Sequence, residues 1–380
     1  MPITQRVDIL VVGAGPAGSR AAAAAAREGA ETLLVDAKTR IGEQPHCGEY
    51  VPARLFGEAN LDRCPVMQAV DYMETRVVGS REAGATGKQT LQVTSSPVPG
   101  FIIDRVRFDR DLARAAAAQG ATVFCSTRVV RRENDAWILK CGTDEISVTP
   151  RFVIAADGAT SSVAAMLGLS APDYLRGVQA EVPLAQPLKG TLIFLDRDFV
   201  GGYGWLFPKG STANVGLGVA VADSVHPRAL LDELLARLSA EGLIRPGKLA
   251  RSGGLIPVSG MRAELTRGNV LLCGDAAGLT HPITGAGIPQ AIFSGDLAGR
   301  TAAEALRAGN QQPLVEYKEA IRSWYGGVIR HAAAKRAVMM QLWGHEDFPR
   351  VCEETWIGFK GYRKRVSEGK AMKRSRPGAP

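Results

Sequence analysis

The chain has few cysteines, and none of them stands in a metal-binding or redox motif. The six cysteines are scattered singly along 380 residues: Cys47, Cys64, Cys125, Cys141, Cys273 and Cys352. There is no Cys-x-x-Cys pair and no cysteine and histidine spacing typical of zinc, so the sequence predicts no metal site. Scattered cysteines give no disulfide framework either, and we expect reduced thiols in a cytoplasmic protein.

Long apolar runs are also missing. No stretch reaches the roughly 18 uncharged apolar residues of a membrane-spanning helix, and the N-terminus carries no charged segment followed by an apolar signal core. We therefore expect a soluble or peripheral membrane protein. At 380 residues the chain can bury a large core, and we expect two intertwined domains with a C-terminal extension.

Negative charge is scarce at the end of the chain. Residues 359–380 hold eight lysines and arginines but only one acidic residue, Glu368, so this segment supplies +7 of the net charge of +8. Such a basic tail attracts an anionic membrane surface, at about 1 kcal/mol per basic residue; a solvated terminus is the alternative. Few aromatic residues interleave with these cations, so we expect no specific nucleic-acid partner.

The start of the chain carries a dinucleotide-binding pattern. The strand-like run 7–12 breaks into Gly13-Ala-Gly15-Pro16-Ala17-Gly18, and an alanine-rich helix follows. Gly13 allows the tight turn, Gly15 lets backbone approach a pyrophosphate, and Gly18 lets the helix pack on the strand. The helix N-terminus, with Pro16 and Ala17, then faces the phosphates. Packing alone also produces glycine-rich turns, and this remains the alternative for the loop.

An acidic residue follows at the expected distance. The next apolar run ends at Asp36-Ala37, and Asp36 lies 23 residues after Gly13. This is close to the roughly 20 residues expected for the acid that binds an adenosine ribose. The order of strand, loop, helix, strand and acid therefore favours a dinucleotide with an unphosphorylated 2′-hydroxyl.

Two later strands have the same design, and alternating segments lie between them. Residues 151–155 lead to Asp157-Gly158, and residues 270–272 lead to Gly274-Asp275. Residues 191–195, 203–207 and 214–220 alternate as antiparallel strands do. The sequence thus predicts an α/β fold, in which a Rossmann-like nucleotide-binding domain is interleaved with an antiparallel β-sheet domain that covers the cofactor.

The predicted domains have the following boundaries. The discontinuous nucleotide-binding domain comprises residues 1–65, 101–169 and 256–310, and the substrate-binding sheet comprises residues 66–100 and 170–255. A C-terminal helical region, residues 311–358, and the basic tail, residues 359–380, complete the chain.

The nucleotide-binding segments together resemble FAD-dependent oxidoreductases of the para-hydroxybenzoate hydroxylase-like group. The resemblance rests on the N-terminal fingerprint, on Ala156-Asp157-Gly158, and on the run from Gly274-Asp275 to Gly285-Ala-Gly287. It implies FAD as the cofactor, held in part by these residues. Asp275 is then expected to accept hydrogen bonds from the ribityl chain. The helix that starts with Gly285, Gly287 and Ile288 directs its N–H groups at the flavin pyrimidine edge, where reduced flavin is negative.

Two further cofactor contacts follow from the same resemblance. Arg105 resembles the arginine that reaches the cofactor in this group, with a surface ion pair as the alternative. Val129 is assigned to the cofactor on the same ground.

Within the group, residues 5–320 resemble the geranylgeranyl reductase family. The run Gly202-Tyr203-Gly-Trp205-Leu-Phe207-Pro208 resembles the family's Y-x-W-x-F-P segment. Tyr203, Trp205 and Phe207 share one face of a strand, so the resemblance implies an aromatic wall that binds substrate over the flavin, with Tyr203 and Trp205 also catalytic. Ordinary packing of a sheet is the alternative.

The loop after Asp36 carries a second sign of this family. Pro45-His46-Cys47-Gly48-Glu49 resembles its Cys-Gly element. The resemblance places Cys47 and Gly48 at the cofactor, where Cys47 either donates a proton, and is then catalytic, or shapes the covering loop. A small buried hydrophobe is the alternative for Cys47.

The implied function is an FAD-dependent reductase that saturates C=C bonds of an isoprenoid, geranylgeranyl-type chain by hydride transfer from reduced flavin N5. A flavin-dependent monooxygenase of an aromatic or other small substrate is the alternative. A flavin halogenase is less favoured. That group has the pattern W-x-W-x-I-P, and this chain has Tyr203 and Phe207 in place of its first tryptophan and its isoleucine. A third reading is an electron-transfer or nucleic-acid-binding flavoprotein. No second G-x-G-x-x-G module is present, so we expect NADPH or reduced ferredoxin as a transient electron donor.

Overall fold

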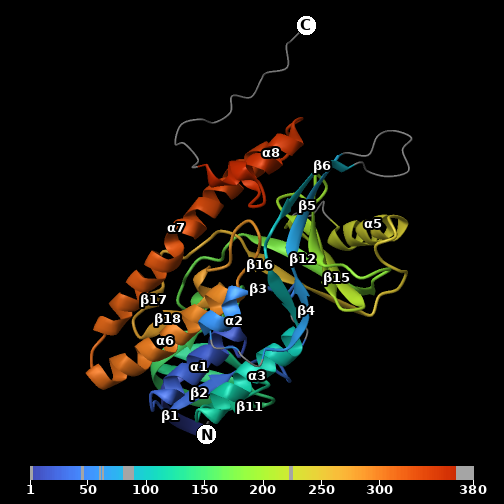
Figure 1. Ribbon diagram of the computed structural model, residues 1–380. Coiled ribbons are helices and arrows are strands. Elements are labelled where there is room, and N and C mark those ends of the chain that lie inside the picture. Colours follow the sequence, from blue (N-terminus) through green and yellow to red (C-terminus); the bar gives the residue numbers. More distant parts are fainter. Residues whose placement is uncertain are drawn as a thin grey trace.

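The computed structural model describes residues 3–43, 47–59, 61, 64–79, 90–221 and 226–364. Two large sheets lie one beyond the other, and a long C-terminal helix runs along both (Figure 1). Pro45 and His46 of the predicted Cys-Gly element lie outside the described residues, as do residues 365–380 of the predicted basic tail.

An eight-stranded sheet forms the nucleotide-binding half, as expected. Its main path is β17-β18-β11-β1-β2-β8, and β10 pairs with both β11 and β9. The strands are β1 (Ile3–Val12), β2 (Thr32–Val35), β8 (Thr122–Phe124), β9 (Thr127–Glu133), β10 (Ala136–Cys141), β11 (Asp144–Ala155), β17 (Thr266–Arg267) and β18 (Val270–Leu272). β1 runs parallel to β2 and β11. Parallel strands are covered on both faces, which explains why all four residues of β2 are buried.

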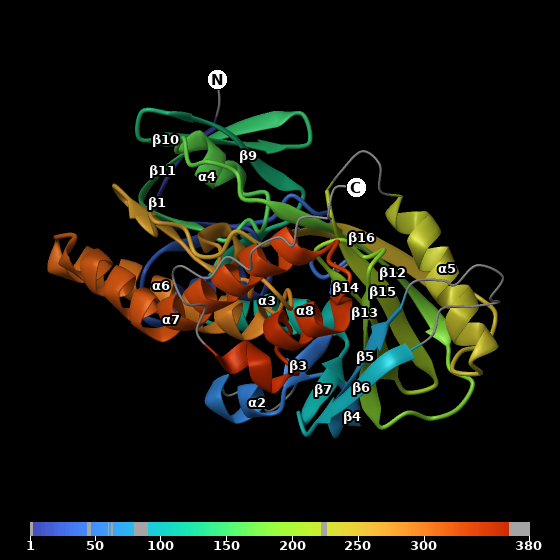
Figure 2. The same cartoon turned by 90° about the horizontal axis from the view of Figure 1, so that it is seen from above.

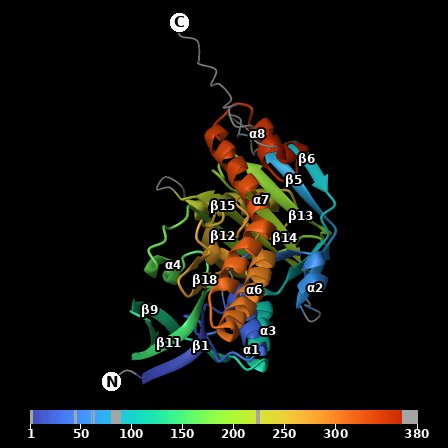
Figure 3. The same ribbon diagram turned by 90° about the vertical axis from the view of Figure 1, so that its left-hand side faces the viewer.

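Helices with small residues pack beside this sheet. The three main ones are α1 (Pro16–Arg27), α3 (Arg105–Ala118) and α6 (Ile288–Ala308), and α1 contacts both others (Figure 3). A Cβ at Gly295 or Gly299 of α6 would lie 2.1 Å from a carbonyl oxygen of α1. The glycines of α6 and the alanines of α1 therefore permit a very close crossing, which bulkier residues would prevent.

A seven-stranded sheet forms the second half. Its order is β16-β12-β15-β14-β13-β5-β6. The strands are β5 (Tyr72–Val78), β6 (Thr90–Ser96), β12 (Tyr174–Pro183), β13 (Gly190–Asp196), β14 (Tyr203–Lys209), β15 (Thr212–Ala220) and β16 (Ala250–Pro257). Leu192 and Phe194 pack with the leucines of α5 (Pro227–Ala240), whereas Ile193 and Leu195 belong to a cluster with Trp205 on the other face. The period of two thus divides the sheet between two cores.

One strand pair departs from the predicted antiparallel pattern. β13 runs parallel to β5, with Gly190 opposite Tyr72 and Asp196 opposite Val78. Parallel strands need a long crossover connection, and here the whole stretch from β6 to β12 supplies it. Sequence alternation alone does not distinguish the two directions.

A small third sheet lies between the halves. It has the order β3-β7-β4, with β3 (Tyr50–Pro52), β4 (Val66–Val70) and β7 (Gly100–Ile103). We placed residues 66–70 with the substrate-binding sheet, but β4 hydrogen-bonds to β7 and not to that sheet. The short helix α2 (Arg54–Ala59) follows β3, whereas the short helix α4 (Ser162–Met166) follows β11 and packs in the nucleotide-binding half.

The C-terminal region bridges the two halves. It contains α7 (Gln312–Leu342), α8 (Phe348–Thr355) and the 3₁₀ helix η2 (Lys360–Arg363). Tyr317 and Ile321 of α7 belong to the nucleotide-binding core, whereas Ala332 and Met339 pack with α8 and with Trp205 of the second sheet. Phe348 and Cys352 of α8 share this cluster with Ile193 of β13 and Trp205 of β14, and α8 is drawn near both strands in the view from above (Figure 2). Among the described residues, no helix is both long enough and apolar enough to cross a bilayer.

Candidate active site

The glycine loop after β1 is shaped by close packing at two positions and by open space at a third. Gly13 has φ +98°, and a Cβ at Gly18 would lie 1.7 Å from the Gly13 carbonyl oxygen. A Cβ at Gly15 would meet nothing within 4 Å, and Gly15, Pro16 and Ala17 line a large cavity. Gly15 also caps α1 without a side-chain hydrogen bond. Free N–H groups that face open space are what a pyrophosphate requires, so the loop fits the cofactor's phosphates.

Asp36 is held at the end of β2 by backbone donors. Its Oδ2 accepts from the Ala14 N–H at 2.7 Å, and its Oδ1 accepts from the Lys38 N–H at 2.8 Å. Each carboxylate oxygen retains a second lone pair, so the group can still accept a ribose hydroxyl. Asp36 and the exposed Ala37 lie outside the cavity lining.

The loop after β18 forms the opposite wall of the cavity. Its 3₁₀ helix η1 (Gly274–Ala277) places Asp275 in the cavity, and the Thr280 hydroxyl donates to the Asp275 carboxylate. Burial raises the pKa of Asp275, although the Thr280 hydrogen bond and the Arg105 charge oppose the rise. Gly285 has φ +68°, and Gly287 caps α6 without a side-chain hydrogen bond. A second uncapped helix N-terminus, starting at Ile288, therefore borders the same cavity.

Arg105 and Cys47 lie together at the centre of this arrangement. Both line the cavity, and the Arg105 guanidinium makes two 3.0 Å hydrogen bonds to the Asp109 carboxylate. Burial lowers the pKa of Arg105, but the nearby Asp109 and Cys47 raise this pKa by more than burial lowers it. The Arg105 guanidinium therefore stays charged. The Asp109 side chain is buried and that of Arg105 is only 12% exposed, which differs from the surface ion pair considered above. The Cys47 Sγ accepts from the Glu49 N–H at 3.2 Å, and Gly48 lines the cavity beside it.

Three further predicted cofactor residues, Asp157, Val129 and Gly274, also lie outside the cavity lining. The Asp157 carboxylate accepts from the hydroxyls of Ser161 and Ser162 and from the Val163 N–H at the start of α4. Val129 is 2% exposed in the core of the nucleotide-binding half, and Gly274 is buried. None of the three lines the cavity, although Gly158 does. A side-chain contact of Asp157 or Val129 with the cofactor thus stays a prediction.

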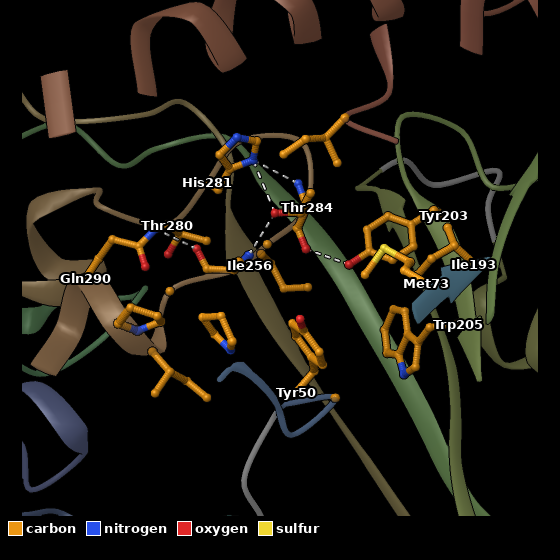
Figure 4. Close-up of a pocket in the computed structure, with 18 of the residues that line it drawn as sticks. Tyr50, Met73, Ile193, Tyr203, Trp205, Ile256, Thr280, His281, Thr284 and Gln290 are labelled. Atoms are coloured by element: carbon orange, nitrogen blue, oxygen red, sulfur yellow. Dashed lines mark hydrogen bonds between the residues drawn. The ribbon is translucent and has the colours of Figure 1, made fainter. Parts of the chain in front are cut away.

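The predicted aromatic row faces the cavity from β14. Tyr203, Trp205 and Phe207 all line it, with ring centroids 5.7 and 6.3 Å apart along the row. The Tyr203 hydroxyl donates to the Thr284 carbonyl at 2.5 Å (Figure 4). The Trp205 Nε1–H donates to Gln179 Oε1 at 2.9 Å. Since the polar atoms of both rings are already bonded, the row presents mainly apolar surface.

The cavity is large enough for more than a cofactor. Its volume is about 2220 Å³, whereas pockets for drug-sized ligands span about 300–1,000 Å³. Residues of both halves line it, together with α7, α8 and η2. The structure thus brings the Cys-Gly element, Arg105, Asp275 and the aromatic row into one space.

Glu49 is an important residue that the sequence reasoning missed. It has φ +71° and is 4% exposed. Its carboxylate accepts from Asn214 Nδ2 at 2.7 Å and from the Arg105 N–H at 3.2 Å, and it pairs with Lys209 Nζ at 2.7 Å. Burying a charge requires such partners. This network ties the Cys-Gly element to β14 and β15, and its only local sign is the adjacency of Glu49 to Cys47-Gly48.

His281 and Trp356 were also missed. His281 is 6% exposed, and its Nδ1 accepts from the Thr284 N–H at 3.2 Å. Burial and the neighbouring His331 lower the pKa of His281 to about 4. The Trp356 ring lies 4.8 Å from that of Tyr203. Both residues line the cavity; His281 lies within the run from Gly274 to Gly287 but was given no role, and Trp356 stands in no pattern that indicates it.

Comparisons with known proteins agree with this architecture. The FAD binding domain family matches residues 6–191, and the geranylgeranyl reductase catalytic domain matches residues 190–245. Digeranylgeranylglycerophospholipid reductase 1 of Methanosphaera stadtmanae is 31% identical, over 95% of this chain and 91% of that protein. The corresponding reductase of Methanocaldococcus jannaschii is 32% identical, over 83% and 82%.

A solved structure gives the same result. The geranylgeranyl bacteriochlorophyll reductase-like protein of Thermoplasma acidophilum superposes with a TM-score of 0.78 and 26% identity, over 94% of this chain and 92% of that one. The fold, the cavity and these relatives agree, and the chain belongs to the geranylgeranyl reductase family of FAD-dependent oxidoreductases.

Proposed function

We propose that the protein saturates carbon–carbon double bonds of an isoprenoid, geranylgeranyl-type chain. The observation that carries the proposal is the wall formed by Tyr203, Trp205 and Phe207 in the same cavity as Gly15, Arg105 and Asp275. An isolated alkene has no polar group for a protein to bind, so it must be held by apolar contact. Burial of apolar surface contributes about 25 cal/mol per Å².

The wall is suited to a long apolar chain. Met73 and Ile193 line the cavity beside the aromatic row (Figure 4). The Tyr203 hydroxyl donates to Thr284 and the Trp205 N–H donates to Gln179. Neither ring therefore has a free donor that would bind water in the cavity. A dry apolar surface positions the double bond and keeps water away from it, which are the main catalytic effects open to an unactivated alkene.

Residues on both sides of the cavity are proposed to hold FAD. Gly13, Gly15, Pro16, Ala17 and Gly18 would hold the pyrophosphate, and Asp36 the ribose. Asp275 would bind the ribityl chain, and Gly285, Gly287 and Ile288 would face the flavin. Bound FAD, once reduced, supplies a hydride to one alkene carbon.

Cys47 is the proposed source of the proton for the other carbon. Its thiol lines the cavity, and it is oriented by the Glu49 N–H at 3.2 Å. Cys47 is hydrogen-bonded to the Arg105 side chain, so loss of the proton leaves a thiolate beside a cation. Solvent returns the proton before the next cycle. The hydride and the proton together account for the two hydrogens gained by each double bond.

The electron donor and the place of work are also proposed. With one dinucleotide fingerprint in the sequence, NADPH or reduced ferredoxin would act on the flavin transiently. The basic tail, residues 359–380, would hold the protein at an anionic membrane surface, where a lipid substrate resides.

Anaerobic single turnover tests the function. The bound flavin is reduced chemically, geranylgeraniol or a geranylgeranylated glycerolipid is added, and flavin reoxidation is followed with mass analysis of the product. We expect reoxidation and a gain of two mass units per double bond. A flavin that stays reduced until oxygen is admitted, and then turns over only with an aromatic compound, would contradict the proposal in favour of a monooxygenase.

A further inference from the structure

The C-terminal segment forms one end of the cavity. α8 and η2 lie over the seven-stranded sheet (Figure 1), and Trp356 and Phe359 line the cavity between them. The Trp356 Nε1–H donates to Thr75 Oγ1 of β5 at 3.2 Å. The substrate space therefore has an end wall that comes from outside both sheets.

Side chains of α7 hold this segment in place. Lys335 of α7 is 5% exposed, and its Nζ donates to the carbonyls of Glu354 and Gly361 at 2.7 and 3.2 Å. His331 Nε2 lies 2.8 Å from the Tyr362 carbonyl oxygen, and the Tyr362 hydroxyl lies 3.2 Å from His281 Nε2. The backbone of η2 is thus bonded to α7, and its Tyr362 hydroxyl contacts the loop that carries His281.

Three basic residues stand where this wall meets solvent. Lys360, Arg363 and Lys364 line the cavity and are all exposed, so they lie at its mouth. In a 3₁₀ helix the side chains at i and i+3 eclipse one another, which places Lys360 and Arg363 on one side of η2. Among the described residues, no carboxylate pairs with any of the three, whereas nearby Arg350 pairs with Glu354 at 3.2 Å.

Another exposed part of the cavity lining has a different charge. At α2 it contains Arg54 and Glu58, one of each sign. At α8 and η2 the lining holds four cations, Arg350, Lys360, Arg363 and Lys364, against Glu353 and Glu354, so this end is net positive. Arg350 pairs with Glu354 and Gln92 donates to Glu353, which leaves the three cations at η2 facing an interior of aromatic and aliphatic side chains. The cavity thus combines an apolar body with a cationic mouth, which matches an amphiphile whose head is an anion.

We propose that Lys360, Arg363 and Lys364 bind the phosphate-bearing headgroup of the isoprenoid substrate while its chain lies along Trp356 and the aromatic row. The inference rests on the proposed function, because it takes the apolar body of the cavity to hold an isoprenoid. Arginine matches phosphate with a fork of two N–H donors, and lysine adds point charge. The substrate's own phosphate, and not a phosphate of the surrounding membrane, is the intended ligand.

Equilibrium binding tests the headgroup site without relying on turnover. Geranylgeranyl diphosphate and geranylgeraniol are titrated into the FAD-loaded full chain in neutral detergent, and quenching of tryptophan fluorescence is measured. We expect the diphosphate to bind at least about tenfold more tightly than the alcohol. In K360Q/R363Q this ratio should fall by about tenfold, whereas the charge-conserving K360R/R363K should keep most of it.

A matched control removes the same charge elsewhere. Arg128 and Lys140 are cross-strand neighbours on β9 and β10, exposed and outside the cavity lining, so R128Q/K140Q should keep the wild-type ratio. An unchanged ratio in K360Q/R363Q overturns the inference, and reduced binding of that variant to anionic vesicles would then assign the cations to the membrane. If the wild type binds neither ligand, the proposed function fails; if it binds both equally, only the headgroup site fails.

Discussion

Cys47 is the residue on which the proposed proton transfer depends. We expect C47A to retain FAD but to slow the single-turnover reoxidation of reduced flavin by isoprenoid by about 100-fold or more, as for loss of a positioned general acid. Stopped-flow absorbance under anaerobic conditions measures this rate.

Cys64 offers a control for this substitution. It belongs to the same apolar cluster as Cys47 but does not line the cavity, and burial raises its pKa to about 12. C64A should therefore react at the wild-type rate. A C47A rate equal to that of the wild type would mean that water supplies the proton.

His281 makes the stability of the protein sensitive to acid. Its Nδ1 accepts from the Thr284 N–H, so the neutral ring carries its proton on Nε2, beside the Tyr362 hydroxyl. The folded protein keeps this ring neutral down to a pKa of about 4, whereas an unfolded chain protonates it near 6.5. Between these values the unfolded state binds more protons, so the free energy of unfolding falls as the pH falls, by about 3 kcal/mol in all.

Acid titration of variants tests this expectation. H281N keeps an acceptor for the Thr284 N–H but cannot titrate, so it should lose less stability than the wild type between pH 6.5 and pH 4. Thermal unfolding of the FAD-loaded protein, measured through that range, gives the comparison. H345N changes an exposed histidine and should follow the wild type. Parallel curves for H281N and the wild type would show that another group causes the acid loss.

One buried cation, Lys335, joins α7 to both α8 and η2. Removal of Lys335 leaves the carbonyls of Glu354 and Gly361 without that donor, and an unsatisfied buried group costs about 1–3 kcal/mol. In K335M we expect amides of α8 and η2 to exchange with solvent about 5- to 150-fold faster, while those of β1 and α1 are unchanged. Hydrogen exchange with mass spectrometry resolves the two regions.

A neighbouring substitution separates this local effect from a general one. Arg330 lies on the same helix, is exposed and lies outside the cavity lining, so R330M should exchange as the wild type does. Equal exchange in K335M and R330M would mean that the wall is held by its apolar contacts alone.

The local patterns of the sequence predicted the nucleotide-binding half well. Periodicity and glycine spacing located β1, α1, β2 and the ends of β11 and β18, because each depends on residues within a few positions of one another. The alternating run at Tyr203 predicted one face of β14 in the same way. These features place the cofactor side and the aromatic row.

The rest of the site depends on contacts between distant segments. Glu49 meets Asn214 across 165 positions, and Trp356 meets Thr75 across 281. No periodicity marks such pairs, and without an alignment nothing in the sequence connects them. For the same reason the parallel direction of β5 and β13 and the end wall from α8 were not anticipated.

The proposed membrane contact of the basic tail concerns the molecule as a whole. Deletion of residues 365–380 removes five lysines and arginines and one glutamate. At about 1 kcal/mol per basic residue near an anionic surface, we expect binding to phosphatidylserine vesicles to fall more than 100-fold at low salt. Vesicle sedimentation measures the bound fraction.

Salt provides the internal control for that measurement. At 1 M ionic strength the Debye length falls to about 3 Å, so full-length and truncated proteins should bind vesicles equally weakly. Flavin content should be the same for both proteins. Undiminished vesicle binding after truncation would place the membrane contact elsewhere on the molecule.

The parallel pair of β5 and β13 also governs when the protein can fold. Gly190 must be synthesised before Tyr72 finds its partner, and Val270 before Val153 of β11 finds its partner on β18. Each sheet is therefore completed only after strands of the other sheet have been synthesised. During translation the seven-stranded sheet is complete only at Pro257 and the nucleotide-binding sheet only at Leu272, so exposed strand edges persist until late in synthesis. A gene split between β11 and β12 separates strands of both sheets. The two fragments are therefore expected to aggregate, unless they are made together.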